Sequence, residues 1–461
     1  MGSGNKRAMT SLWFETALLP EGWARSVRIE HADGVITALT PDRPAEPGDE
    51  RGAIAAPGLP NLHSHAFQRG MAGLAETGGR DGDDFWSWRE VMYRFVDRLD
   101  PDEVEAIAAQ AYVEMLESGF TRVGEFHYLH HDPAGAPYAH PGEMAARIAA
   151  AAASTGIGLT LLPVFYAHGD FGGASPGEAQ RRFIHSPESF ARLLETSRIA
   201  VSGLADAVVG LAPHSLRAAT PEELAAIIPL AAAGPIHIHI AEQMREVEGC
   251  VAWSGQRPVA WLLDHAEVDD RWCMVHATHM SPEETEGLAA SGAVAGLCPI
   301  TEANLGDGLF PAQAFLGAGG RFGVGSDSNV LIDAAEELRT LEYGQRLAKR
   351  ARGLLGSKAR PSVGGNLFSG ALAGGARALG LKVAGLEAGA SLDLISLNAD
   401  HPAMAGASGD SILDAWIFAA RGGAVDGVWR HGRKVVTGGR HHHRDEIARI
   451  YRRVIARVLS L

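Results

Sequence analysis

The chain of 461 residues contains only three cysteines, Cys250, Cys273 and Cys298, and no CxxC pair. A disulfide framework and a thiolate zinc cluster both need more cysteines at closer spacing, so we expect neither. This scarcity favours a reducing compartment, and the expected location is the cytoplasm. The sequence also lacks any run of about 20 apolar residues, and MGSGNKRAMTSLWFE has no apolar core of a signal peptide. We therefore expect neither secretion nor a membrane span.

Positive charge is also scarce, because 41 Lys and Arg face 55 Asp and Glu, for a net charge of −14. This balance disfavours a broad phosphate-binding surface, so nucleic acid is not an expected partner. An acidic small molecule is still a possible ligand, because a few arginines inside a pocket can outweigh the diffuse negative field of the whole chain. A hydrophobic share of 46% and a charged share of 21% are typical of a folded globular protein. The one high count is 20 His, a residue that binds metals and transfers protons near neutral pH.

Short apolar runs alternate with amphipathic helical segments along the middle of the chain. The runs are residues 53–65, 121–128, 158–166, 207–215, 235–243, 272–280, 293–301 and 321–329. Such alternation is typical of βα units around a parallel sheet, and eight units close a (β/α)₈ barrel. Four N-cap residues that precede a proline mark helix starts: Asp100, Ser186, Thr220 and Ser281. We therefore predict an α/β protein with a TIM barrel over residues 57–385.

The two ends of the chain alternate polar and apolar residues, with Gly and Asp at the turns. This pattern predicts antiparallel hairpins in residues 9–56 and 386–440, including the segment DAWIFAARGGAVDGVWRHGRKVVTGG. Together they would form a small, discontinuous β-sandwich domain beside the barrel. Residues 441–461 predict a basic amphipathic helix that packs on the protein rather than on a membrane. The tract His441-His442-His443 is expected to be exposed and without a function.

Polar residues close several of the apolar runs, and a barrel brings such residues together at the carboxyl ends of its strands. In the first run, residues i and i+2 of an HxH motif point the same way. The residues at these ends are His63, His65, His239, Glu242, His276 and Asp327. Nitrogen donors with one carboxylate suit Zn²⁺ better than Mg²⁺ or Ca²⁺, while Fe²⁺ and Mn²⁺ remain open. The sequence thus predicts a metal site at this rim.

Several motifs resemble a known family. Four motifs resemble those of the amidohydrolase superfamily, in its mononuclear deaminase branch. They are the HxH of PGLPNLHSHAFQR, the HIAE that ends at Glu242, the first histidine of VHATHM and the Asp of SDSN. Within that branch, NLHSHAFQRGMAGLAE, DDFWSWREVMYRF and EFHYLHHDP resemble the N-formimino-L-glutamate deiminases of histidine degradation. The resemblance covers the barrel nearly end to end and reaches the flanking β domain. It implies a zinc hydrolase that converts N-formimino-L-glutamate to N-formyl-L-glutamate and ammonia, as a homodimer.

The resemblance also implies roles for individual residues. The ligands of one zinc ion per subunit would be His63, His65, His239 and Asp327, with no carboxylated lysine. Glu242 would donate a proton to the amidine nitrogen, His276 would polarise the reacting group, and Asp327 would accept the proton of the attacking water. The residues that would bind the dicarboxylate substrate are Gln68, Arg89, Tyr128, His214 and Arg217.

Other positions have no settled role at this stage. The HxxE spacing makes His239 the ligand, so His237 is expected behind the site or packed in the barrel. His279 is expected to be a loop histidine. Glu302 and Asn304 follow the run 293–301 and are candidates to line the site, without an assigned role. The aromatic residues Trp86, Trp88 and Tyr93 would wall the pocket or form an oligomer contact, and the element over the site would be residues 76–95 or 128–142.

Two other functions are alternatives. A purine deaminase of the guanine or adenosine type would need aromatic stacking and neutral hydrogen bonds, without a pair of arginines for carboxylates. Arg89 and Arg217 therefore separate this alternative from the first. An inactive barrel scaffold is the least favoured reading, because such a protein should have lost metal ligands and all four are present.

Overall fold

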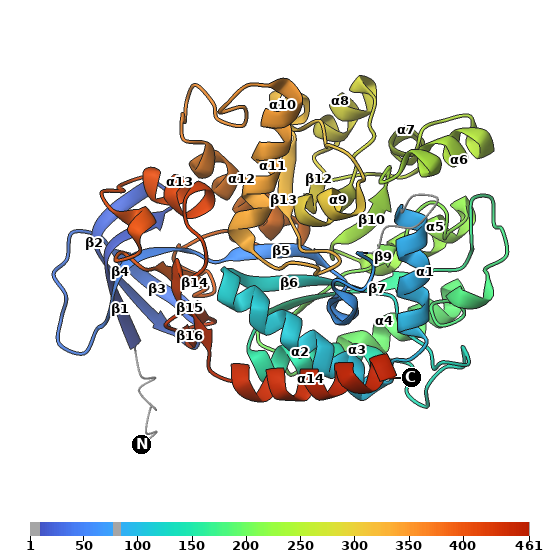
Figure 1. Cartoon of the computed structure of the whole chain (residues 1–461), viewed down its shortest axis with the longest axis horizontal. Helices are drawn as coiled ribbons and strands as arrows, with labels where there is room; N and C mark the ends of the chain where they lie inside the picture. Colours follow the sequence, from blue (N-terminus) through green and yellow to red (C-terminus); the bar gives the residue numbers. More distant parts are fainter. Residues whose placement is uncertain (1–9, 77–83, 461) are drawn as a thin grey trace, which may run out of the picture.

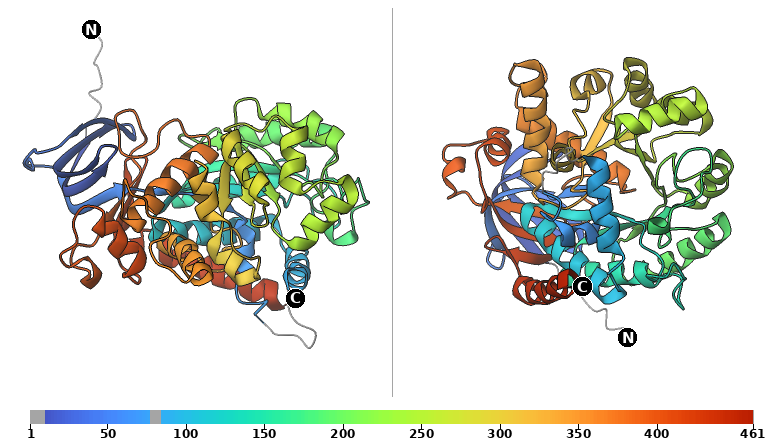
Figure 2. Two further views of the ribbon diagram at one scale, coloured as in Figure 1. Left: turned by 90° about the horizontal axis from the view of Figure 1, so that it is seen from above. Right: turned by 45° about the vertical axis from the view of Figure 1, so that its right-hand side comes forward.

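The computed structural model describes residues 10–76 and 84–460, and its larger part is a barrel of parallel strands with helices outside (Figures 1 and 2). The barrel strands are β5 (Leu59–Ser64), β6 (Phe120–His127), β7 (Gly158–Phe165), β8 (Val208–Val209) with β9 (Ala212–Pro213), β10 (Ile236–Ile240), β11 (Trp272–His276), β12 (Val294–Leu297) and β13 (Arg321–Val324). Parallel bridges between Leu211 and Ile236 and between Ser64 and Asp327 join the two halves of this sheet. The predicted TIM barrel is confirmed, with its fourth strand split in two.

Helices follow the strands and cover the barrel. Their bounds are α2 (Pro101–Ser118), α3 (Glu143–Thr155), α4 (Pro187–Val201), α5 (Pro221–Ile227), α6 (Met244–Ser254), α7 (Pro258–His265), α8 (Pro282–Ser291), α9 (Pro299–Leu305), α10 (Ala312–Gly317), α11 (Ala334–Lys349) and α12 (Val363–Ala378). The four predicted N-caps are confirmed, since the side chains of Asp100, Ser186, Thr220 and Ser281 each accept a hydrogen bond from the third residue of their helix.

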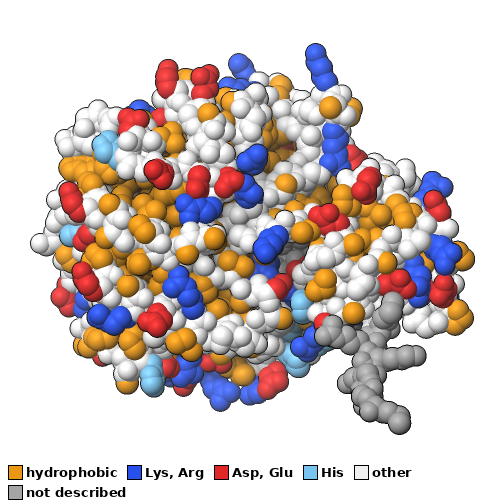
Figure 3. Space-filling view, turned by 180° about the vertical axis from the view of Figure 1, so that it is seen from behind, with side chains coloured by type: hydrophobic (Ala, Val, Ile, Leu, Met, Phe, Trp, Pro, Cys, Tyr) orange, Lys and Arg blue, Asp and Glu red, His pale blue; other side chains and the backbone are white. Residues whose placement is uncertain are grey.

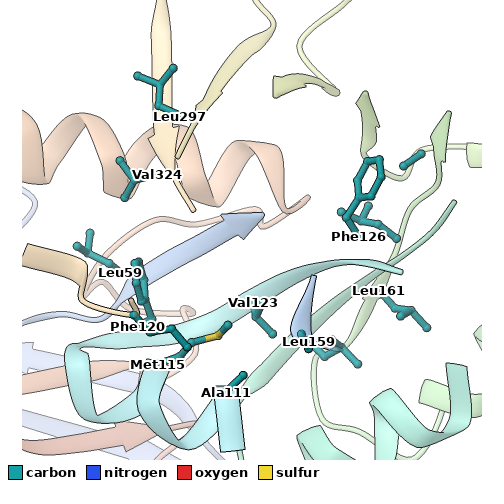
Figure 4. Packing of buried hydrophobic residues seen from close by; sticks show 14 of the residues in the cluster. Leu59, Ala111, Met115, Phe120, Val123, Phe126, Leu159, Leu161, Leu297 and Val324 are labelled. Carbon is teal, nitrogen blue, oxygen red and sulfur yellow. The ribbon is translucent and has the colours of Figure 1, made fainter. Parts of the chain in front are cut away.

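The core lies between the strands and these helices. Every residue of β6 and β7 is buried, as expected for a parallel sheet covered on both faces. Figure 4 shows Ala111 and Met115 of α2 beside β6, which contributes Phe120 and Val123. Burying one such large side chain contributes about 1.5–3 kcal/mol, so the outer helices hold the strand ends in fixed positions.

The two chain ends form one sheet beside the barrel. Its strands run in the order β17-β16-β15-β14-β4-β1-β2-β3, with β1 (Thr10–Leu19), β2 (Gly22–Ala32), β3 (Val35–Thr40), β4 (Glu50–Pro57), β14 (Leu394–Leu397), β15 (Val425–Arg430), β16 (Arg433–Thr437) and β17 (Arg440–His441). The sheet curls strongly, because the rings of Phe14 in β1 and Trp429 in β15 lie 5.9 Å apart although two strands separate them. The predicted sandwich from both ends is thereby confirmed as a folded-over sheet, and the chain enters the barrel at Gly58.

One predicted strand is wrong. The DAWIF segment belongs to a helix, α13 (Ser411–Phe418), and not to a hairpin. Ile412, Leu413, Trp416 and Ile417 are buried, and their spacing of one and four residues has the period of a helix rather than the period of two of a strand. The helix packs against α11 and α12, so its apolar face lies on the barrel side of the small domain.

The chain ends in α14 (Arg444–Ser460), which packs on α2 (Figure 1). Ile447 and Val458 are buried, and the hydroxyl of Tyr451 donates to the carbonyl of Arg69, so the helix is a packing helix as predicted. The prediction that all three residues of the histidine tract are exposed is wrong for His441. Its ring is buried at the end of β17 and pairs with the carbonyl of Thr155 at 2.9 Å.

The surface carries charges of both signs. On the face shown in Figure 3, basic and acidic side chains are interspersed among polar and hydrophobic ones. Among the described helices, we find none that is both long enough and apolar enough to cross a membrane.

Candidate active site

Three histidines and one aspartate meet at the carboxyl ends of β5, β10 and β13. Nε2 of His63 lies 3.2 Å from Nε2 of His65 and 3.0 Å from Nε2 of His239. Oδ1 of Asp327 lies 3.3 Å from Nε2 of both His63 and His65. Ligands at about 2.1 Å from a tetrahedral ion stand about 3.4 Å apart, so this spacing suits one metal ion. All four residues are buried.

The protonation of these groups also suits a metal. Nδ1 of His65 lies 2.9 Å from the carbonyl oxygen of Phe126 and donates to it, which leaves a lone pair on Nε2. Burial lowers the pKa of His63 to about 3 and lowers the pKa values of His65 and His239 too, so the imidazoles are neutral. Burial alone would raise the pKa of Asp327, but the hydrogen bond from His63 and the neighbouring imidazoles lower it overall, so this carboxylate is ionised. Neutral imidazoles and a carboxylate are the forms that bind a metal.

The backbone around Asp327 is held in a left-handed conformation, with φ at +44°. The amide of Asn329 secures it by donating to Ser64 Oγ and to the carbonyls of His65 and Asp327. A Cβ on Gly325 would lie 2.7 Å from the backbone nitrogen and oxygen of His63, so only glycine lets β13 approach β5 this closely. A strained backbone conformation of this kind persists only where the surrounding contacts hold it in place. Here the conformation directs the carboxylate of Asp327 toward the three imidazoles.

Two further titratable side chains lie beside these candidate metal ligands. Nε2 of His276 is 3.6 Å from Oε1 of Glu242 and 4.0 Å from Oδ2 of Asp327. Burial raises the pKa of Glu242 to about 7. Burial would lower the pKa of His276, but the Glu242 carboxylate and a hydrogen bond to Glu302 raise it well above its ordinary value. At neutral pH the Glu242 carboxyl can therefore hold or release a proton, while the raised pKa of His276 favours the protonated imidazole.

Two acidic residues in this cluster were not assigned a role from the sequence. Glu302 lies at the start of α9, where its Oε1 is 3.3 Å from Nδ1 of His276 and accepts from the amide of Cys298. Asp307 is buried with one oxygen within 4.8 Å of ligand atoms of Glu242 and His276, and burial raises its pKa to about 9. The glycines on either side of Asp307 have positive φ, and this Gly-Asp-Gly turn is the only sequence signal for it that we can identify.

The five predicted substrate-binding residues line one pocket with His65, His239 and Asp327. They are Gln68, Arg89, Tyr128, His214 and Arg217. The amide of Gln68 donates to the hydroxyl of Tyr128 at 2.9 Å, and Nε of Arg89 donates to the hydroxyl of Tyr93 at 2.7 Å. Within residues 10–76 and 84–460, Nε of Arg217 is buried without a hydrogen-bond partner. An unpaired guanidinium nitrogen in a pocket is suited to an anionic ligand.

The element over this pocket is the helix α1 (Phe85–Val96), which contributes Phe85, Trp88, Arg89, Met92 and Tyr93. Of the two loops considered from the sequence, 76–95 thus supplies the cover, apart from residues 77–83, which lie outside the described residues. From the loop 128–142, Tyr128 lines the pocket.

The remaining candidates turn away from the metal ligands. Nε2 of His237, two residues before His239 on the same face of β10, lies 2.7 Å from the carbonyl of Ala378 and so pairs away from the candidate metal ligands. Nε2 of His279 lies 2.7 Å from the carbonyl of Asp307 and so anchors that loop. The amide of Asn304 donates to Glu76.

Comparisons with known proteins agree with this geometry. The model of the amidohydrolase family matches residues 54–435, and the model of the formimidoylglutamate deiminase N-terminal domain matches residues 9–53. The formimidoylglutamate deiminase of Pseudomonas aeruginosa is 51% identical over 98% of this chain and 100% of its own length. The 5-methylthioadenosine/S-adenosylhomocysteine deaminase of Natronomonas pharaonis is 29% identical over 85% of this chain and 81% of its own.

Two solved structures are similar in fold. An amidohydrolase from Brucella melitensis, 56% identical, superposes with a TM-score of 0.95 over 98% of this chain and 100% of that one. An adenosine deaminase from Xanthomonas campestris with bound zinc has a TM-score of 0.81 over 98% and 99% of the two chains. At 21% identity, the second likeness supports the fold alone.

Proposed function

This chain belongs to the amidohydrolase family, and on that premise we propose that it hydrolyses N-formimino-L-glutamate to N-formyl-L-glutamate and ammonia at a site for one zinc ion. The observation that carries the proposal is the presence of Arg89 and Arg217 in the same pocket as the metal ligands. A substrate with two carboxylates needs such charges, whereas a purine would leave them unpaired in a buried pocket. The arginines therefore favour a linear amidine over a purine.

The members of this family depend on a metal, and the residues of this chain fit one. We assign the ion to His63, His65, His239 and Asp327, a set of three neutral nitrogens and one carboxylate that suits zinc. When bound, zinc supplies Lewis acidity and lowers the pKa of water at its open position toward ~7. The identity of the metal is part of the proposal.

The protons move between residues of the chain itself. Asp327 accepts a proton from the attacking water, whose oxygen forms a bond with the formimino carbon. Glu242, with a pKa of about 7, donates a proton to the amidine nitrogen as the carbon becomes tetrahedral. Asp327 then passes its proton to the same nitrogen while the new hydroxyl group returns a proton to Glu242, so the C–N bond breaks, ammonia leaves and the formyl C=O forms. Protonated His276 stabilises the negative charge that develops on the oxygen bound to the reacting carbon, an effect typically worth about 3 kcal/mol for one donor.

The rest of the pocket orients the glutamate part of the substrate. Arg89 and Arg217 pair with carboxylate, and the neutral side chains of Gln68 and Tyr128 donate hydrogen bonds. Burial lowers the pKa of His214 well below its ordinary value, so this ring stays neutral and donates from one nitrogen. Charged and neutral donors around one pocket select an anionic substrate and hold its amidine over the metal ligands.

We also propose that the protein works in the cytoplasm and as a homodimer. The three cysteines are free and buried, in keeping with a reducing compartment. Sedimentation of the purified chain tests the dimer, since a monomer would contradict it.

The function is tested by removing metal from the purified chain, adding back Zn²⁺, Fe²⁺ or Mn²⁺ in turn, and following ammonia release from N-formimino-L-glutamate. Guanine and adenosine are assayed in parallel. Zinc-dependent release from the formimino compound alone is the expected result. Release from a purine alone would contradict the substrate, and no release from any compound would favour the inactive scaffold.

A further inference from the structure

Three guanidinium groups surround the indole of Trp86 in the first turn of α1. The Cζ atoms lie 4.3 Å from the ring centroid for Arg245, 5.2 Å for Arg89 and 5.9 Å for Arg217. Arg89 and Arg217 belong to the pocket described above, whereas Arg245 comes from the start of α6. One aromatic ring therefore links the two pocket arginines to a third arginine outside the pocket.

Arg245 and Trp86 line a second cleft that adjoins the pocket. This cleft shares Arg89 and Arg217 with the pocket, so the two spaces meet at these arginines. Its other walls include Gly169, Asp170, Phe171, Glu246 and Glu248. A dicarboxylate in the cleft would lie next to the side chains that hold it in the pocket.

The three arginines make no close ion pair with a carboxylate, although Glu246 and Glu242 attract Arg217 at longer range. Among the side chains that the structure describes, none brings a carboxylate oxygen within 4.0 Å of the guanidinium nitrogens of Arg89, Arg217 or Arg245. The carboxylate of Glu246 instead accepts from the backbone amides of Ala241 and Glu242. The guanidinium N–H groups that face the cleft are therefore not occupied by a close carboxylate, and an anion that enters the cleft can form close pairs with them.

We propose that this cleft is an outer carboxylate-binding site, in which Arg245 receives the dicarboxylate before Arg89 and Arg217 take it over. The inference rests on the proposed function, because the ligand is the substrate named there. A chain with a net charge of −14 repels a dianion, and a local cation at the mouth of the pocket offsets this repulsion. The indole holds the face of the guanidinium and leaves its N–H edge for the ligand. The carboxylates of Asp170 and Glu248 lower the affinity of the cleft for an anion. A site that passes its ligand on to the inner pocket requires such a moderate affinity.

The test is the dependence of kcat/KM on ionic strength in Arg245→Gln. At low salt we expect kcat/KM to fall about 5-fold with little change in kcat, and the difference from the parent to vanish near ~0.5 M salt, where the Debye length is only a few ångströms. Arg421→Gln, at an exposed position in the small domain, loses the same charge and serves as the matched control. Arg245→Lys keeps the charge and should restore most of the loss. Equal salt profiles for Arg245→Gln and Arg421→Gln would overturn the inference and leave the deiminase function intact.

A second readout separates this inference from the function. Calorimetry with glutarate, a dicarboxylate without the formimino group, measures binding without catalysis. If the parent chain released no ammonia, weaker glutarate binding by Arg245→Gln than by Arg421→Gln would still support the outer site. Equal binding by the two variants would reject it. Melting temperatures close to that of the parent show that both variants are folded.

Discussion

Oε1 of Glu302 lies 3.3 Å from Nδ1 of His276, on the ring nitrogen opposite the one that faces Glu242. The imidazole is thus flanked by two carboxylates. Because Glu302 also accepts from the backbone amide of Cys298, it is fixed at the end of β12 and holds His276 in one orientation. We therefore describe Glu302 as a positioning residue for His276, the group that we propose stabilises the charge on the attacking oxygen.

The first prediction concerns Glu302→Gln, which removes the charge and keeps the shape. The pKa of His276 is raised by Glu242 and by its hydrogen bond to Glu302, so the variant should lower this pKa. In the proposed mechanism His276 acts when protonated, so the alkaline limb of the variant's pH profile should lie at a lower pH than that of the parent. At neutral pH its kcat should be about 10-fold lower than that of the parent. The pH profile of kcat measures this, Glu302→Asp should retain the parent profile in part, and an unshifted alkaline limb would contradict the role.

The second prediction concerns the metal ligands. Removal of metal by a chelator should abolish ammonia release and lower Tm, because binding stabilises the folded state by mass action. His239→Ala should lower kcat about 10³-fold or more and reduce the bound zinc from one ion per chain to a fraction of it. The neighbouring His237 pairs with the carbonyl of Ala378, so His237→Gln is the matched control and should keep its zinc. Loss of zinc from His237→Gln and not from His239→Ala would reverse the assignment.

The third prediction concerns the substrate carboxylates. Arg217→Met and Arg89→Met should each raise KM about 10- to 100-fold, the cost of one lost charged hydrogen bond, with a smaller effect on kcat. The control is Arg98→Met. Arg98 does not line the pocket, and it donates to the carbonyl of Val458 in α14. If either pocket variant released ammonia from N-formimino-L-glutamate with the parent KM, that arginine would have no part in substrate binding.

The fourth prediction concerns Trp86, whose ring contacts Arg89, Arg217 and Arg245. Trp86→Leu removes a cation–π partner worth about 0.5–1 kcal/mol for each arginine, so KM should rise about 10-fold when all three are affected. Trp86→Phe should recover part of this loss because it keeps an aromatic face. Trp88→Leu, two residues away on α1, is the control for a general disturbance of the helix, and an equal rise in KM for it would remove the case for Trp86.

The sequence predicts the metal ligands because two simple periodicities locate them. Apolar runs mark barrel strands, and parallel strands place their carboxyl ends together, so His63 and Asp327 could be paired although 263 intervening residues separate them. The same reasoning places Glu302 after the run 293–301, near the site, but gives it no role. It does not reach Asp307, because this residue comes close to His276 only through the path of the loop after α9, which no apolar periodicity predicts.

The errors have a similar cause. Buried helical residues in DAWIF carry aromatic and β-branched side chains that are also typical of strands, and the contacts with α11 and α12 decide between the two. A run of three histidines predicts exposure for His441, yet its ring is buried at the end of β17 and pairs with the carbonyl of Thr155, while His442 and His443 are exposed. The group of arginines around Trp86 depends on the approach of α1 to α6, a long-range contact that composition does not encode.

The last prediction concerns acid stability and a second group of histidines. The ring of His185 lies 4.9 Å from that of His130 and 4.6 Å from that of His131, outside the active site. Burial, and then His131, lower the pKa of His185 to about 3. The unfolded chain binds a proton on this residue below about pH 6.5 and the folded chain does not, so stability falls as the pH drops from about 6.5 toward 3. At pH 5 this residue alone costs about 2 kcal/mol.

The variant His185→Phe keeps an aromatic ring and removes the titrating nitrogen, so its free energy of unfolding should depend less steeply on pH between 6.5 and 4 than that of the parent. Urea unfolding at several pH values measures this slope. Protonation of the metal ligands also destabilises the fold in acid, but it contributes equally to parent and variant and cancels in their difference. The exposed His140 gives the control His140→Gln, which should follow the parent curve. If His185→Phe also follows the parent curve, then the acid sensitivity of this fold resides in the metal site and not in the buried histidines beside α4.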